Sequence, residues 1–202
     1  HVEEKRLKSR RPTSKELAKT PFKFGEIRQR GEQSSLIIPA VSSENRNYLP
    51  VGYLPPNCIV SNAAFVIEDA PLWSMAIVAS KLHLVWVATV CGRIETRYRY
   101  SNTLGWNTFP VPKLTEKNVE DLTRCSEDIL IARELHFPAT IAELYEPDTM
   151  SENLRSAHDR NDEVLERIYI GRRFKNDTER LEKLFDLYTK MTSTKSSSMR
   201  AS

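Results

Sequence analysis

The stretch Cys91-Gly-Arg-Ile-Glu-Thr-Arg-Tyr-Arg-Tyr-Ser101 organises this chain, and it continues through Asn107-Thr-Phe-Pro-Val-Pro112. Its centre alternates between charged side chains and side chains that are apolar, aromatic or, at Thr96, small and polar. Alternate residues of an extended strand point to opposite faces. A single strand here would therefore carry four charged side chains on one face, namely Arg93, Glu95, Arg97 and Arg99.

This charged face has two interpretations. In the first, it reads the edges of DNA base pairs, because Arg donates in a fork to guanine and Glu accepts from the cytosine amino group. In the second, it is a solvated edge strand in which Glu95 and Arg97 form an internal ion pair. The alternation by itself favours neither interpretation.

A resemblance to a known family favours the first. Gly92–Ser101, followed by Asn107–Pro112, resembles the target-recognition domain of MmeI-like enzymes. These are single-chain restriction-modification proteins that join an endonuclease, an adenine-N6 methyltransferase and a DNA-reading domain. The similarity covers most of residues 20–190. Other stretches resemble the family in the same order: Ile38–Pro50, Ser80–Trp86, and Leu144–Pro147 through Ala157–Asp162.

The resemblance implies that this chain supplies sequence specificity to a larger bacterial, cytoplasmic enzyme. Its partners would be double-stranded DNA and an upstream methyltransferase domain of the same polypeptide. The catalytic parts, with the cofactor S-adenosylmethionine, would lie in that upstream region, with or without an endonuclease. We expect no cofactor in this chain.

The resemblance also implies which residues read bases. Within the family, the residues that match Glu95 and Arg97 vary as a pair with the base pair recognised, and a member with Lys and Asp there reads the inverted pair. Glu accepting from cytosine and Arg reaching the paired guanine agree with this pattern. Thr96 and Arg99 match neighbouring specificity positions, and Ala63 matches another if the spacing is ungapped.

Contacts with the DNA backbone have their own candidates. Ser42, Ser43 and Arg46 combine two hydroxyls with an arginine on a polar loop, which suits phosphate binding. The alternative is that the same residues serve only ordinary turn chemistry. Lys81 and Arg93 are the remaining backbone candidates.

Composition limits the alternatives. The 202 residues are enough for one large domain or two small ones. Residues 1–30 hold ten Lys or Arg against four Asp or Glu, whereas residues 113–190 hold 13 against 18. The basic segment could neutralise phosphates, and the acidic one would repel DNA and pack on protein. The three cysteines are too far apart for a zinc site or a disulfide framework, and no apolar run is long enough to span a membrane.

The pattern predicts an α+β fold, in which a mixed sheet with a packed helix precedes an all-helical domain. We expect a basic helical lead-in at 1–20, a target-recognition domain at 21–112, a helical domain at 113–191 and a disordered tail at 192–202. One helix is expected from Ala70 to Ala88, with Asp69 as its cap. Expected strands are Leu36–Ile38, Cys58–Val60 and Ala64–Ile67.

In the helical segment, caps are expected at Thr115, Thr140, Ser151 and Asp177, and Gly171 should end a helix. A run of polar residues on one of these helices should bond to a neighbouring segment: His158, Asp159, Asn161 and Asp162. We expect His83 to be a core or hydrogen-bonded histidine.

Catalytic motifs are not found in the sequence. With six glycines it has no Gly-rich phosphate loop, and it has neither a GxSxG elbow nor an HExxH motif. The adenine methyltransferase motifs Asn-Pro-Pro-Tyr and Asp-Pro-Pro-Tyr are missing as well. We therefore expect no catalytic residues and no metal site in this chain. The alternative function is a helical protein-protein interaction module with no direct DNA reading.

Overall fold

The computed structural model describes residues 1–23 and 32–199, with side chains to residue 193. It confirms the α+β class. Among these residues the strands form two three-stranded sheets, and their pairings are antiparallel, whereas the sequence led us to expect one mixed sheet. No helix in the described part of the chain has both the length and the apolar character needed to cross a bilayer.

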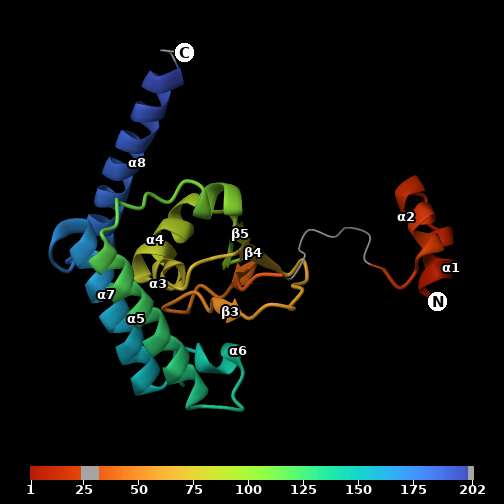
Figure 1. Ribbon diagram of the computed structural model, residues 1–202, viewed down its shortest axis with the longest axis horizontal. Coiled ribbons are helices and arrows are strands. Elements are labelled where there is room, and N and C mark those ends of the chain that lie inside the picture. The colour runs from red at the N-terminus through yellow and green to blue at the C-terminus, as the bar shows by residue number, and fades with distance from the viewer. Residues whose placement is uncertain (24–31, 200–202) are drawn as a thin grey trace.

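The N-terminal segment forms a small helical unit, drawn in red in Figure 1. It consists of α1 (Val2–Leu7), α2 (Pro12–Glu16) and the short 3-10 helix η1 (Leu17–Lys19). The guanidinium of Arg6 donates to the carbonyl oxygens of Leu17 at 2.8 Å and Thr20 at 2.9 Å. This one side chain thus satisfies carbonyl groups at the end of the unit, where helical hydrogen bonding stops.

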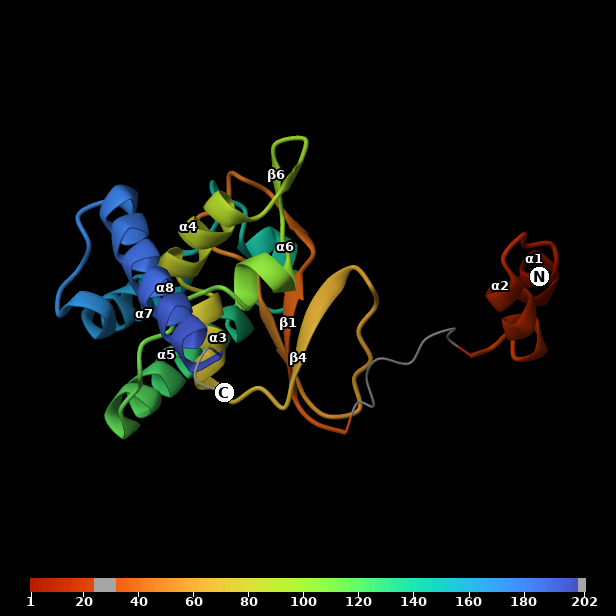
Figure 2. The same cartoon turned by 90° about the horizontal axis from the view of Figure 1, so that it is seen from above.

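One continuous stretch of chain links the two sheets (Figures 1 and 2). The first sheet contains β1 (Ser35–Pro39) between β3 (Gly52–Leu54) and β4 (Ala64–Glu68). The second contains β2 (Val41–Ser42), β6 (Arg97–Arg99) and β5 (Arg93–Ile94), in that order.

Ala40 is the point at which the chain changes sheet. Its amide donates to the carbonyl of Ala63 beside β4, and its carbonyl accepts from the amide of Tyr100 beside β6. The strand expected at Cys58–Val60 does not form. Asn57, which follows two prolines, has a φ of 70°, so the backbone turns there instead of extending.

The single helix expected from Ala70 to Ala88 is instead two helices, α3 (Trp73–Val78) and α4 (Lys81–Val90). Ser80 separates them, with an extended backbone and a hydroxyl that accepts from the amide of His83 at 3.1 Å. A serine side chain that caps a new helix competes with continuation of the old one. Asp69 has a φ of 52° and is not the cap that we expected.

The helices that follow match the predicted periodicity closely. After η2 (Asn102–Trp106, a π-helical turn), they are α5 (Glu116–Glu134), α6 (Ile141–Leu144), α7 (Glu152–Ile170) and α8 (Asp177–Met199). Thr115 and Thr140 form capping boxes as expected. Gly171 ends α7 with a φ of 78°, which favours glycine.

Three details of the helical caps and of the tail differ from expectation. Ser151 occupies the N-cap position of α7, but its hydroxyl makes no capping bond. Asn176 rather than Asp177 caps α8, accepting from the amide of Glu179 at 2.9 Å. Helix α8 continues to Met199 where a disordered tail was expected from Thr192, whose hydroxyl bonds to the carbonyl of Tyr188 within the helix. Residues 200–202 lie outside the described residues.

Two hydrophobic clusters form the core, and both cross the expected domain boundary at 112/113. One joins Leu36 of β1 to Ile129 of α5 and Leu154 of α7. The other joins Trp86 of α4 to Leu165 of α7. In Figure 2 the helices α3, α4, α5, α7 and α8 accordingly lie to one side of the sheets. The two segments therefore fold on each other and share their stabilisation.

Candidate nucleic-acid interface

The stretch singled out in the sequence forms a hairpin, not the single strand that we expected. β5 and β6 pair in antiparallel fashion, with Arg93 opposite Tyr98 and Ile94 opposite Arg97. The chain reverses at Glu95 and Thr96, and Glu95 has a φ of 56°. This left-handed backbone is uncommon for a residue other than glycine and allows so tight a turn.

The turn divides the charged side chains between two faces. Residues directly opposite each other in a hairpin share a face. Arg97 and Arg99 therefore lie on one face, whereas Arg93 lies on the other with Tyr98. The guanidinium of Arg93 lies 4.9 Å from the centre of the Tyr98 ring, and it donates to the Thr96 carbonyl at 2.8 Å. A face with four charges in a row is not formed.

The candidate reading pair nevertheless stays together at the tip. A nitrogen of the Arg97 guanidinium lies 2.7 Å from a carboxylate oxygen of Glu95, and both side chains are largely exposed. An ion pair in such an exposed position contributes little to stability, because water and salt screen it. Breaking this ion pair therefore costs little free energy, and both Glu95 and Arg97 are free to bond to another donor or acceptor instead.

The root of the hairpin is buried and anchored. The Tyr100 hydroxyl lies 3.1 Å from Nε2 of His83, which is fully buried and packs edge-on against Phe109. Burial lowers the pKa of His83 to about 3 and raises the pKa of Tyr100 above its ordinary value. The expectation of a core histidine is confirmed. Figure 2 shows the loop between β5 and β6 projecting from the rest of the molecule.

Ala63 lies close to the anchored root of the hairpin. It is exposed in the turn just before β4, and its carbonyl accepts from the amide of Ala40. The next residue, Val41, is paired with Arg99 of β6. The structure thus brings Ala63 and Arg99 against the consecutive residues Ala40 and Val41, although Ala63 and Arg99 are far apart in sequence.

The candidates for contact with the DNA backbone differ in how accessible their side chains are. Ser42 is buried, with 3% of its surface exposed, so its hydroxyl is not available at the surface. Arg46 forms an ion pair with Glu146 beside α6 at 2.7 Å, with 15% of its side chain exposed. Ser43 is partly exposed and accepts from the amide of Asn45. Lys81 is partly exposed at the first turn of α4.

A buried polar cluster joins α7 to the sheet domain, as expected for the polar residues of that helix. The Asp162 carboxylate accepts from the amide of Lys81 at 2.7 Å and from the Tyr48 hydroxyl at 3.0 Å. The Tyr48 ring stacks on His158, whose Nε2 lies 2.7 Å from the Tyr145 hydroxyl. The sequence placed these groups on a helix surface, whereas the structure buries them in an interface.

Burial shifts the pKa values in this cluster. Burial, aided by the nearby Arg133, lowers the pKa of His158 to about 3. Burial raises the pKa of the Asp162 carboxyl to about 7, although its hydrogen bonds with Lys81 and Tyr48 oppose the shift. Across residues 1–23 and 32–199, no three His, Cys, Asp or Glu side chains come together in a way that could hold a metal ion.

These values predict that acid destabilises the chain. His83 and His158 are neutral when folded and take up protons when unfolded, so their stabilisation is complete above about pH 6.5 and falls toward pH 3. Asp162 has the opposite effect between pH 7 and 4. Its pKa is raised in the folded chain, so its protonation there increases the free energy of unfolding as the pH falls. Two histidines act against one carboxyl. The free energy of unfolding should therefore fall by the contribution of about one histidine, about 1.4 kcal/mol for each unit by which the pH is lowered.

Urea denaturation at pH 6.5, 5.5 and 4.5 measures this slope. His158→Asn should flatten it, because one of the two buried histidines is removed. His136→Gln is the matched control, since His136 is partly exposed, and it should leave the slope unchanged. A stability that is constant or rises toward pH 4.5 would contradict the prediction.

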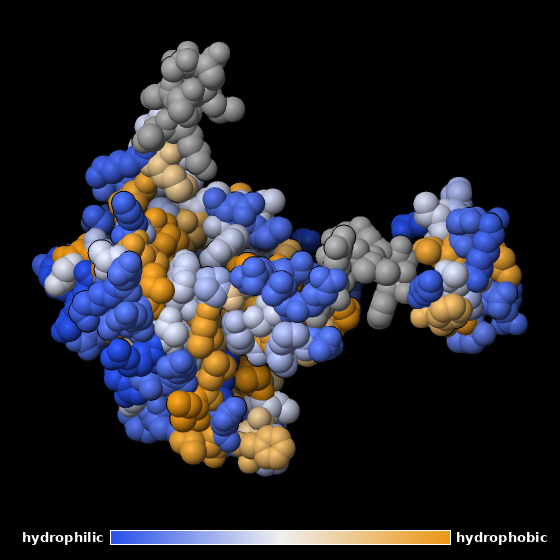
Figure 3. Space-filling model, in the orientation of Figure 1, coloured by the Kyte–Doolittle hydropathy of each residue, from blue (hydrophilic) through white to orange (hydrophobic). Residues whose placement is uncertain are grey.

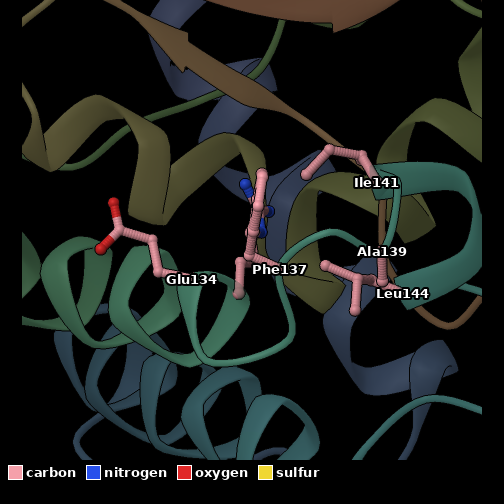
Figure 4. Close-up of a pocket in the computed structure, with 6 residues that line it drawn as sticks. Glu134, Phe137, Ala139, Ile141 and Leu144 are labelled. Carbon is pink, nitrogen blue, oxygen red and sulfur yellow. The ribbon is translucent and has the colours of Figure 1, made fainter.

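The helical segment also exposes an apolar patch, seen in orange low on the molecule in Figure 3 where α6 lies in Figure 1. Its large exposed side chains are Ile131, Leu135, Phe137 and Ile141. Beside it is a pocket of about 380 Å³ that Arg133, Glu134 and several apolar residues line. In Figure 4 the Glu134 carboxylate points away from Phe137 and Leu144. Arg133 is bonded to Tyr145 and the Val51 carbonyl, so few polar groups are free to orient a ligand there.

The fold and the site are those of a target recognition domain built onto a helical domain. The chain belongs to the MmeI family, as the resemblance implied. Residues 1–113 match the family model described as "MmeI, target recognition domain", and residues 114–195 match "MmeI, C-terminal domain".

Two relatives are similar over nearly the whole chain. DNA methyltransferase A of Bacillus subtilis (strain 168) is 41% identical over 187 residues, which are 93% of this chain and 21% of the relative. A structure of the Type IIL restriction-modification enzyme MmeI in complex with DNA matches with a TM-score of 0.87 and 38% identity, over 95% of this chain and 26% of that one. The chain thus spans about a fifth to a quarter of the length of these relatives.

Proposed function

We propose that this chain recognises a specific sequence in double-stranded DNA on behalf of a DNA-modifying enzyme, and that the hairpin β5–β6 is its reading element. One observation carries the proposal. An exposed Glu95–Arg97 pair stands at the tip of a hairpin with a buried root, within a target recognition domain of the MmeI type. The solved relative is a structure in complex with DNA, which supports the choice of ligand.

Recognition would proceed by exchange of partners at the hairpin tip. In the free protein Glu95 accepts a hydrogen bond from Arg97. In the major groove the Glu95 carboxylate would accept from the amino group of cytosine, and Arg97 would donate to O6 and N7 of the paired guanine. Such a contact discriminates against a wrong base by about 1–3 kcal/mol. The reading pair has its charges paired before DNA arrives, so neither group is left without a partner.

Contacts with phosphate would fix the hairpin in register on the duplex. Arg93 lies beside the reading pair and is exposed, and Lys81 is partly exposed on α4. Arg99, on the same face as Arg97, stays a candidate for base readout. Ser43 is the more accessible of the two loop serines. Basic side chains of this kind supply affinity that depends on salt and is largely independent of sequence.

We place catalysis elsewhere in the same polypeptide. The curated relative is named a DNA methyltransferase, and the matched region is 21% of it. An upstream methyltransferase domain that uses S-adenosylmethionine would therefore be the partner of this chain, and adenine its target. A bacterial enzyme of this kind would act in the cytoplasm, where the DNA is.

Binding to DNA at several salt concentrations tests the proposal. The motif is first mapped from methylated adenines in cells that carry the intact enzyme. The enzyme should then bind a duplex with that motif at least about tenfold more tightly than a scrambled duplex, and its affinity should fall steeply with salt. Lys81→Ala should weaken binding to both duplexes alike and reduce the salt slope by about 1. Equal binding of the two duplexes at every salt concentration would contradict the proposal.

The apolar patch favours a second function, contact with protein. Ile131, Leu135 and Phe137 present exposed apolar surface on the acidic helical segment, where DNA would be repelled. A protein surface, for which the catalytic part of the same polypeptide is our candidate, suits this patch. If reversing the charges of Glu95 and Arg97 altered no DNA property, this second function would replace DNA reading.

A further inference from the structure

A side-chain hydrogen bond at the root of the hairpin ties it to α4. The Tyr100 hydroxyl, just after β6, lies 3.1 Å from Nε2 of His83. The other ring nitrogen of His83, Nδ1, is buried and has no hydrogen-bond partner in the described part of the chain. A buried polar atom without a partner destabilises the folded state, and an apolar ring in this place would avoid that cost. What the histidine adds is therefore its bond to Tyr100.

Helix α4 is held from two sides, so it provides a fixed point for that bond. The Asp162 carboxylate of α7 accepts from the amide of Lys81 at 2.7 Å, and the Ser80 hydroxyl accepts from the amide of His83 at 3.1 Å. Further along α4, Trp86 is buried and packs against aromatic rings of α8. The His83 side chain thus starts from backbone that both α7 and α8 hold in place.

The hairpin itself is joined to the sheet by a short ladder, in which two residues of β2 pair with Tyr98 and Arg99. Next to this ladder, the Tyr100 ring packs against Phe65 and against the backbone at Gly105, where an added Cβ would lie 3.3 Å from the ring. Packing contacts of this kind are not directional, whereas a hydrogen bond has a preferred distance and angle. The hydroxyl therefore fixes the orientation of the ring and of the strand that carries it.

The length of the hairpin makes this orientation matter at the tip. Thr96, in the turn, lies four residues from Tyr100, which is about 13 Å along an extended strand. A tilt of about 5° at the root would therefore move the tip by about 1 Å, enough to take a hydrogen bond to a base out of range. Residues 92–97 are exposed, so their position depends on how the root is held.

We infer that Tyr100 and His83 are positioning residues for DNA reading: their hydrogen bond sets the angle of the hairpin β5–β6 and thereby the discrimination between bases at its tip. Neither side chain needs to touch DNA, since Tyr100 is 4% exposed and His83 is fully buried. The inference rests on the proposed function and goes beyond it, because it assigns part of the specificity to buried residues, one of them outside the hairpin.

Tyr100→Phe in the intact enzyme tests the inference, because it removes the hydroxyl and keeps the ring. Dissociation constants are measured for three duplexes: one with the mapped motif, one scrambled, and one with the base pair inverted at the position that Glu95→Lys with Arg97→Asp identifies. The ratio between the inverted duplex and the motif duplex should fall about tenfold. The affinity for the scrambled duplex, which depends on phosphate contacts, should be unchanged.

Tyr169→Phe is the matched control. Tyr169 lies on α7, is 6% exposed, and donates from its hydroxyl to the Pro110 carbonyl at 2.8 Å. Its substitution therefore also removes one buried hydrogen bond and keeps the ring. It should lower the thermal stability comparably and leave the ratio of dissociation constants unchanged.

The outcomes separate this inference from the proposed function. A ratio retained by Tyr100→Phe would overturn the inference. So would weaker binding of all three duplexes by one factor, since the hydroxyl would then serve the fold alone, or an equal loss of the ratio in Tyr169→Phe. In each of these cases a motif changed by Glu95→Lys with Arg97→Asp would keep the proposed function. If that double substitution left the motif intact, the proposed function would fail, and the inference with it.

Discussion

Replacing Glu95 with Lys and Arg97 with Asp together is expected to change one position of the methylated motif from C to G and to leave the other positions intact. The double substitution exchanges the acceptor and the donor at the hairpin tip. Lys donates to guanine and Asp accepts from cytosine, so the inverted base pair satisfies both groups. The exchange also preserves an ion pair at the tip and its net charge, so affinity for phosphates should be unchanged.

The effect should be large because it has two parts. The Lys and Asp side chains bond to the inverted base pair. Against the original base pair, they would set donor against donor and acceptor against acceptor. With about 1–3 kcal/mol for each contact, preference between C and G at this position should reverse by one to two orders of magnitude. Methylation mapping in cells that carry the intact enzyme measures the result directly.

A matched exchange on another exposed pair provides the control. Glu163 and Arg167 form an ion pair at 2.5 Å on α7, away from the hairpin. Glu163→Lys with Arg167→Asp should leave the motif unchanged. Persistence of the original motif in the Glu95 and Arg97 double variant would show that these residues are structural, and the base-reading surface would then have to be sought elsewhere.

Glu166→Ala is expected to destabilise the chain by about 3–5 kcal/mol, the cost of breaking a buried ion pair by removing one partner. Glu166 lies on α7 and is fully buried. Its carboxylate accepts from Arg180 of α8 at 2.5 and 2.8 Å and from the backbone amide of Phe174 at 3.1 Å. Without it, the buried amide of Phe174 would lose its acceptor, and the nearly buried Arg180 guanidinium would keep only the partly exposed Asp177.

The same glutamate fixes the start of α8, which packs on α4. Phe185 and Tyr188 of α8 contact Trp86, with ring centres 5.1 and 5.8 Å apart. Loss of the carboxylate should therefore loosen α8 and lower the urea midpoint in one transition. Glu163→Ala, on the same helix but in an exposed pair, should cost only about 0.3–0.5 kcal/mol. If the two substitutions lowered the free energy of unfolding equally, the buried ion pair would contribute no more to stability than the exposed one, and the prediction would be wrong.

The helical segment was the most predictable part of the fold, because its signals are local. A capping box needs only residues three apart, as at Thr115, and a left-handed helix end needs one glycine, as at Gly171. The break between α3 and α4 was missed because the apolar pattern continues through it. Only Ser80 marks the break, and a serine within a helical pattern is a weak signal.

The hairpin shows how a correct pattern led to a wrong shape. Each strand of a hairpin alternates just as one long strand does, so the alternation from Arg93 to Tyr100 fits both. Tight hairpin turns are usually marked by glycine or asparagine, and here Glu95 takes the left-handed backbone instead. The alternation placed Glu95 and Arg97 together on one charged strand face, but it did not predict that the turn divides the charges between two faces.

Long-range partners could not be predicted at all. The sequence indicated that the polar residues around Asp162 bond to a neighbouring segment, but not that the segment carries Tyr48, 114 residues away. Likewise, Arg46 fits a phosphate contact when only its loop is considered. Its pairing with Glu146 depends on how α6 packs, which no local pattern contains.

The contrast between the exposed tip and the buried root of the hairpin has a consequence for evolution. Residues 92–97 are exposed, whereas Tyr100 and His83 beneath them are buried. Substitutions at exposed positions usually change stability by less than about 0.5 kcal/mol. Under the proposed function, new target sequences can therefore arise by a few mutations that do not threaten folding, and a lineage of such proteins can diversify its recognition while its scaffold stays the same.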